Sequence, residues 1–219
     1  MSWLSPAFPV GAFSYSHALE YAVESRLVND EATLRDWATI CLRRETGPVS
    51  GLLLRKSWTA AQAKDSDALR KVFAEGRAWV ATSEFELETR AQGQAFMTTY
   101  LAAWDPGDVA LWLAPALADG WVSYPCAVGI AAGMMGVPVR LALIAFFHGL
   151  VSNLISAGIR LIPLGQTAGQ RVLASLDGAL IEAADDALML QERDVGTAAA
   201  VIEWASVQHE TQYTRLFRS

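Results

Sequence analysis

The sequence is poor in charge, histidine and cysteine, and each shortage excludes a class of protein. Only 18% of its 219 residues are charged, and the 17 basic and 23 acidic side chains leave a net charge of −6. Such a chain offers no basic surface for nucleic acid. Its two cysteines, Cys41 and Cys126, lie far apart without C-x-x-C spacing, which predicts reduced thiols and excludes a disulfide framework. Alternation at period two never persists, so a β-sheet is not expected.

Motifs for catalysis are missing as well. The sequence contains no G-x-x-x-x-G-K-[ST] loop to hold phosphates, and Gly165 and Gly169 fail the spacing of a dinucleotide-binding loop. His209 and Glu210 begin like the zinc motif H-E-x-x-H, but Tyr213 stands where the second histidine is required. The three histidines of the chain never share a helix face. The sequence therefore predicts no enzyme, no cofactor and no metal site.

Acidic pairs do not change that conclusion. Glu86 with Glu88, and Asp185 with Asp186, have the pattern of solvated helix faces, so they do not suggest an acid–base pair. A lone histidine in an apolar helix, such as His148, is more often a satisfied core group than a base or a ligand.

Apolar residues at helical spacing are what the sequence has in abundance. Hydrophobic residues make up 53% of a chain long enough for one substantial core. Turn residues at 29–30, 47–48 and 105–107 separate the apolar segments, which predicts eight to ten helices. No linker or repeat marks a second domain. We expect one compact all-α domain over residues 1–219, with an extended arm at residues 1–13 and much surface buried against partners.

One uncharged run, from Leu141 to Ile159, predicts a long apolar helix between Arg140 and Arg160. Its length fits either a membrane span or the central helix of a soluble core. Polar residues in mid-run and the lack of aromatic belts favour the core helix. We therefore predict a helical domain built around this central buried helix, with the membrane hairpin as the alternative. The first eleven residues lack the features of a secretory signal, so we expect a cytoplasmic protein.

The C-terminal residues, 208–219, form a polar and aromatic tail. Its one tyrosine, Tyr213, and its two arginines, Arg215 and Arg218, are of residue types enriched at interface hot spots. Chain ends, in contrast, are usually disordered unless docked. Two interpretations stay open: the tail folds back on its own core, or it binds another protein. Both interpretations hold if the tail packs on its own core and becomes fully ordered when a partner binds.

Four blocks of the sequence resemble the urease accessory protein family UreF. They occur in the family's order: SPAFPVGAFSYSHALE (5–20), ELETRAQGQ (86–94), SNLISAGIRLIPLGQTAGQ (152–170) and HETQYTRLFRS (209–219). The resemblance implies a soluble, all-helical, homodimeric protein that assists nickel insertion into urease. It also implies the partners: UreD (called UreH in some species), the GTPase UreG, which supplies the nickel, and the urease apoprotein.

The same resemblance carries a set of partner-binding residues onto this chain. They are Gly11, Tyr15, Glu20, Arg160, Pro163, Leu164, Gln166, Gly169, Gln170, His209, Glu210, Tyr213, Arg215, Leu216 and Phe217. In the family the C-terminal segment contributes to the contact with UreD/UreH. Two positions depart from the family's pattern. Ala18 replaces the usual glycine, and Ala168 replaces the usual aspartate, so a charged contact from that turn is not carried over.

Polar side chains recur every four residues along the long apolar helix, at His148, Ser152, Ser156 and Arg160. The polar groups of such a ridge need hydrogen-bond partners. In the nickel-delivery picture, His148, Ser152 and Ser156 line a wet passage for the hydrated ion, which requires oxygen or nitrogen ligands along its path. The alternative, which the sequence favours, is close helix packing with local hydrogen bonds.

A second function stays open beside the nickel-delivery scaffold. The chain can regulate the cycle of its partner GTPase, as an activator or as a fidelity check. Such activators often supply an arginine to the transition state, and Arg160, Arg215 and Arg218 are candidates by residue type alone.

Overall fold

The computed structural model describes residues 2–5, 7–104 and 109–219, and the only regular secondary structure of these residues is helical. The elements, in chain order, are η1 Ser2–Leu4, η2 Ala12–Ser14, α1 Leu19–Glu24, α2 Glu31–Arg44, α3 Thr46–Gln62, α4 Ser66–Ala78, α5 Ser83–Trp104, α6 Val109–Leu117, α7 Tyr124–Met134, α8 Val139–Leu161, α9 Gln166–Ser175, α10 Asp177–Met189, η3 Glu192–Asp194 and α11 Ala200–His209. The prediction of an all-α fold is confirmed.

The helix count is higher than predicted, because the described residues hold eleven α-helices and the sequence predicts eight to ten. Residues 170–190 have the apolar spacing of one helix, but they belong to two. A break at Leu176 separates α9 from α10, and apolar residues continue across the break, so periodicity alone does not reveal it. The turn expected at 105–107 lies outside the described residues.

Two helices, α3 and α7, share the most extensive packing of the fold. Residues 125–133 of α7 are buried on every side. Small residues allow this approach: a Cβ atom added at Gly129 would lie 2.4 Å from the carbonyl oxygen of Leu54, and one at Gly133 would lie 2.7 Å from that of Trp58. The most completely buried helix is therefore α7, and it precedes the helix that the sequence favours as central.

The long apolar helix α8 has one covered face and one open face. It packs against α1, α2, α7, α9 and α10. By length and composition it could cross a membrane, yet only half of its most apolar window is buried. Leu141 is 50% exposed, and His148 and Ser156 are exposed as well. The prediction of a helix buried almost all round is therefore wrong.

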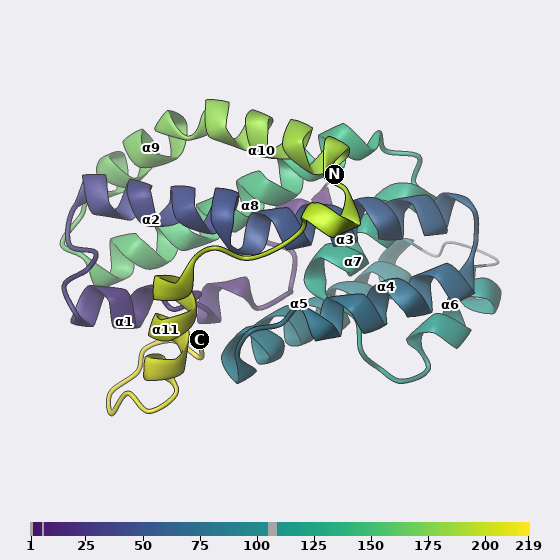
Figure 1. Ribbon diagram of the computed structural model, residues 1–219, viewed down its shortest axis with the longest axis horizontal. Helices are drawn as coiled ribbons and strands as arrows, with labels where there is room; N and C mark the ends of the chain where they lie inside the picture. The colour runs from purple at the N-terminus through teal and green to yellow at the C-terminus, as the bar shows by residue number, and fades with distance from the viewer. Residues whose placement is uncertain (1, 6, 105–108) are drawn as a thin grey trace.

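Aromatic contacts fasten the N-terminal segment to α5. Trp3 and Phe8 are buried, and their rings lie 5.9 Å and 5.0 Å from that of Phe96. The segment predicted as an extended arm contains two 3-10 turns, η1 and η2, within its described part. Figure 1 shows the other end of the chain, where α11 and the C-terminus lie beside α1 and α5, and α9 and α10 run along the opposite edge.

Candidate functional site: the anchored C-terminal tail

Most of the predicted partner-binding residues meet where the C-terminal tail, residues 210–219, crosses α1, α5 and α8. Hydrogen bonds, ion pairs and cation–π contacts connect them to one another or to these helices. The residues brought together in this way are Tyr15, Glu20, Arg160, His209, Glu210, Arg215, Leu216 and Phe217. We refer to this assembly as the terminal site.

Glu20 is the anchor of the tail backbone. Its side chain is buried at the start of α1. Its carboxylate accepts the backbone N–H of Leu216 at 2.6 Å and that of Phe217 at 2.9 Å. The same carboxylate lies 3.1 Å from Nε2 of His209. Hydrogen bonds to a carboxylate are among the stronger ones in proteins, so three of them fix the path of the tail.

His209 joins Glu20 to α5. Its ring is fully buried, with Nε2 facing Glu20 and Nδ1 lying 2.8 Å from Oε2 of Glu84. Both ring nitrogens therefore face carboxylate oxygens, so one side chain joins α1 to α5. The guanidinium of Arg215 also pairs with Glu84, at 3.0 Å. Burial raises the pKa of the Glu84 carboxyl, and the hydrogen bond and charge of His209 and the charge of Arg215 oppose that rise.

A second buried histidine, His17, forms a similar cluster nearby. Its Nε2 lies 2.9 Å from Glu45 and its Nδ1 lies 3.2 Å from Glu88, while its ring stacks on Phe85 at 4.2 Å. Burial by itself lowers the pKa of His17, but the charges of Glu45 and Glu88 outweigh it and raise the pKa to about 10. His17 is therefore an imidazolium at neutral pH.

This second cluster fixes the last residue of the chain. The hydroxyl of Ser219 donates to Glu88 at 2.7 Å, and the backbone N–H of Ser16 donates to the carbonyl oxygen of Ser219 at 2.8 Å. The tail is thus held at two points, by Glu20 and by Glu88. Ala18, two residues before Glu20, has a φ of 63°, a left-handed backbone that favours glycine. This is a physical reason for the glycine usual at that position.

Arg160 closes the terminal site from α8. Its guanidinium lies 4.3 Å from the ring of the buried Phe217 and donates to the carbonyl oxygen of Phe13 at 2.8 Å. Gly11, just before that turn, has a φ of 72°, which a glycine adopts at little cost. Arg160 therefore connects the N-terminal turn η2 to the end of the tail.

Apolar side chains point outward from this fixed backbone. Tyr213 is 103% exposed and Leu216 is 66% exposed, and Phe13 on η2 is 70% exposed. Large apolar side chains on a rigid, solvent-facing segment are typical of an interaction surface. The two interpretations of the tail are therefore compatible. In this structure the tail folds back on its own core, and its outward side chains remain available to bind another protein.

Five of the predicted residues lie apart from the terminal site. They occupy the turn between α8 and the start of α9 and comprise Pro163, Leu164, Gln166, Gly169 and Gln170. Within the described residues no hydrogen bond or ion pair joins this turn to the tail, and Figure 1 places α9 at the edge opposite α11. Gly169 is buried and has a packing role, because a Cβ atom there would lie 2.3 Å from Cδ1 of Ile159.

The polar ridge of α8 lies on the surface of the chain. His148 and Ser156 are exposed, Ser152 is half-buried, and the Ser152 hydroxyl lies 3.5 Å from Nδ1 of His148. The ridge therefore faces outward along the open side of α8, and it leads to Arg160 at the terminal site.

Sequence analysis missed the acidic partners of both histidines. Glu88 was expected on a solvated helix face and is buried instead, and Glu84, one turn before it on α5, is buried too. The available signal is their i, i+4 spacing, which places two carboxylates on one side of a helix. Their partners are 71 and 125 residues away in the chain, so no local pattern marks them.

No group of three or more histidine, cysteine, aspartate or glutamate side chains suited to a metal ion occurs in the part of the chain that the structure describes. The terminal site consists of ion pairs and hydrogen bonds that are satisfied within the chain. These contacts hold the backbone of the tail in place, so that the tail can present a binding surface.

Comparisons with known proteins agree on one family. The UreF family model matches residues 28–177. A urease accessory protein UreF of Rhodopseudomonas palustris (strain BisB5) is 50% identical over 219 residues, which cover 100% of this chain and 89% of that protein. Proteins of the same name from Granulibacter bethesdensis and Bradyrhizobium diazoefficiens are each 45% identical over 219 residues, covering 100% of this chain and 92% and 90% of their own lengths.

Proposed function

Because this chain belongs to the UreF family of urease accessory proteins, we propose that it is a scaffold for nickel insertion into urease. In this role it binds UreD/UreH, recruits the GTPase UreG and acts with them on the urease apoprotein. Family membership also confirms that the chain is an accessory protein of urease maturation and not an enzyme. The observation that supports the scaffold most is the terminal site, where a buried ionic framework holds a tail with outward apolar side chains.

Anchoring the tail favours binding in a simple way. A disordered segment loses conformational freedom when a partner orders it, and this cost reduces affinity. Here Glu20 and Glu88 already hold the tail backbone at Leu216, Phe217 and Ser219. A partner that meets Tyr213 and Leu216 therefore meets a surface that is already ordered.

The open face of α8 supports a homodimer. A 23-residue apolar helix with half of its most apolar window uncovered has the character of a subunit interface, where Leu141 and its neighbours become buried. We propose that the whole chain, residues 1–219, is one helical domain of a cytoplasmic dimer without a membrane segment. In that dimer the packed face of α8 belongs to the core and the open face belongs to the partner copy.

Regulation of the GTPase cycle remains the alternative, and the candidate arginines weigh against it. Arg160 is engaged with Phe13 and Phe217, Arg215 pairs with Glu84, and Arg218 lies over the ring of Tyr15 at 5.9 Å. An arginine that enters a partner's transition state must be released from such contacts. Hydrolysis rates of UreG with and without this chain separate the two functions.

The scaffold proposal predicts that exposed tail side chains carry partner binding. Replacing both Tyr213 and Leu216 with alanine should weaken co-purification with UreD/UreH by about tenfold or more, because a tyrosine that anchors an interface contributes about 2 kcal/mol or more. Thermal unfolding should stay unchanged, since neither side chain is buried. The matched control is Leu111→Ala, a 79% exposed leucine on α6. Equal recovery of UreD/UreH with the double variant and the control would remove the role given to the tail.

The ridge on α8 gives a separate prediction. We propose that His148, Ser152 and Ser156 line a passage for hydrated nickel once partners cover this face. Leucine at both 152 and 156 should then abolish urease activation, a loss of about tenfold or more, because the ion loses its oxygen ligands. The complex with UreD/UreH and UreG should still form. Unchanged activation would mean that the ridge is a packing feature.

A further inference from the structure

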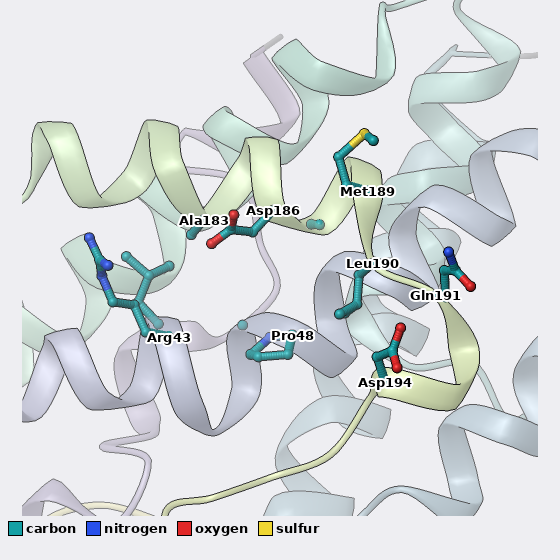
Figure 2. Close-up of a pocket in the computed structure, with 11 residues that line it drawn as sticks. Arg43, Pro48, Ala183, Asp186, Met189, Leu190, Gln191 and Asp194 are labelled. Atoms are coloured by element: carbon teal, nitrogen blue, oxygen red, sulfur yellow. The ribbon is translucent and has the colours of Figure 1, made fainter.

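A groove separates the end of α10 from the junction of α2 and α3 (Figure 2). Its volume of about 390 Å³ falls in the range of ligand clefts, roughly 300–1,000 Å³. The floor is apolar and is formed mainly by Leu42, Pro48, Ala187 and Leu190. Arg43, Asp186, Met189 and Asp194 stand around it. Figure 1 shows α10 on the edge opposite α11, so this groove is separate from the terminal site.

Close packing and hydrogen bonds hold the walls of the groove in place. A Cβ atom at Gly47 would lie 1.7 Å from the carbonyl oxygen of Leu42, and one at Gly51 would lie 2.6 Å from Cβ of Ala187. On the far wall the guanidinium of Arg55 donates to the carbonyl oxygen of Leu190 at 2.6 Å. The groove is thus preformed, and a ligand need not order it.

The rim of the groove is acidic. Asp186 and Asp194 are exposed beside the apolar floor, one on α10 and the other on η3. Arg43 does not balance them, because its guanidinium pairs with Glu182. Asp186 forms no ion pair with any residue that the structure describes, and the nearest cation to Asp194 is its neighbour Arg193 at 3.8 Å. The charge that complements this rim is positive.

Met189 adds an apolar element to the rim. Its side chain is 80% exposed at the end of α10. Methionine is flexible and polarizable, and it is enriched where interfaces adapt to a partner. The apolar floor, the exposed methionine and the two carboxylates together fit one kind of occupant.

We propose that this groove docks a segment of a partner protein in which an apolar side chain is followed by a lysine or an arginine. The apolar side chain covers Leu42, Pro48 and Leu190, and the cation lies between Asp186 and Asp194. The groove goes beyond the function proposed above, because it is a second contact surface with its own chemistry. The apolar and acidic residues of the groove determine which segment binds there, and the C-terminal tail takes no part in this contact.

Short capped peptides test the proposal on the full chain. The probe is Ac-Gly-Ser-Leu-Arg-Gly-Ser-NH₂, and the readout is the backbone amide chemical shifts of the ¹⁵N-labelled protein. The leucine–arginine peptide should shift amides at residues 42–48 and 183–194. Peptides with leucine–glutamate or glycine–arginine in its place should bind about tenfold more weakly or worse, because each lacks one of the two contacts.

Charge-reversed variants then locate the site. Asp186→Lys together with Asp194→Lys should weaken the leucine–arginine peptide by about tenfold or more and reverse the preference toward the glutamate peptide. Asp36→Lys, an exposed change on α2 outside the groove, should leave binding unchanged. Three results would overturn the proposal: shifts elsewhere, equal binding of the arginine and glutamate peptides, or loss of self-association in the groove variant, which would identify a second copy as the occupant.

Discussion

Alanine at position 209 is expected to lower the free energy of unfolding by about 3–5 kcal/mol, because it removes the side chain that both buried carboxylates contact. Glu20 and Glu84 both face the His209 ring and are buried. Arg215 compensates Glu84 alone, and Glu20 keeps only the backbone N–H groups of the tail. The loss is therefore larger than that of an ordinary core truncation.

Denaturant unfolding measures this effect, and His148→Ala is the matched control. His148 is exposed on α8, so its replacement should change the free energy of unfolding by less than about 0.5 kcal/mol. Amide hydrogen exchange adds a local readout, since the N–H groups of Leu216 and Phe217 donate to Glu20. Exchange at these two amides should rise in the His209 variant before the core opens. Equal effects at 209 and 148 would contradict the buried ionic framework.

Stability should fall as the pH rises from about 6.5 toward about 10, since His17 titrates between these values. The folded state holds the pKa of His17 at about 10, against an ordinary value of 6.5 in the unfolded chain. A group with a raised folded pKa contributes fully below the unfolded pKa and loses its contribution as the pH approaches the folded one. Within this window the free energy of unfolding should fall by up to about 1.4 kcal/mol per pH unit.

A His17→Gln variant isolates the histidine contribution. The buried thiols of Cys41 and Cys126 also have raised pKa values because of burial, and they disfavour the folded state as the pH passes their ordinary value of 9. The wild-type chain and the His17→Gln variant both lose stability at alkaline pH for this reason. The difference between the wild-type chain and the His17 variant should shrink from pH 6.5 to pH 9. A difference that stays constant over this range would show that His17 is neutral in the folded state.

The sequence predicts the fold better than it predicts the burial of individual helices. Apolar spacing is enough to predict an all-α chain. It does not rank the helices by burial: α8 is longer than α7, yet α7 is buried on every side. The difference lies in glycines such as Gly129 and Gly133, which let α7 lie directly against α3. The burial of α7 therefore depends on a tertiary contact with α3, and the hydropathy of the sequence does not predict that contact.

The terminal site shows that local sequence patterns also fail to predict which polar residues are buried. A motif comparison places Glu20 and His209 in separate blocks at the two ends of the chain, and it does not pair them. Glu84 and Glu88 resemble solvated helix residues until the chain ends fold over them. Buried ion pairs form between distant segments, so their members carry no local signature. The exposed positions Tyr213 and Leu216 are predicted by the family resemblance, and residue type adds support for the tyrosine alone.

The nickel content of urease in cells tests the central claim most directly. Cells without this chain would be complemented by the wild-type protein, by the double variant Tyr213→Ala with Leu216→Ala, or by Leu111→Ala, at equal protein levels. We expect nickel-loaded urease with the wild type and with Leu111→Ala, and a loss of about tenfold or more with the double variant. Full nickel loading with the double variant, or in cells that lack the chain altogether, would contradict a scaffold that works through its anchored tail.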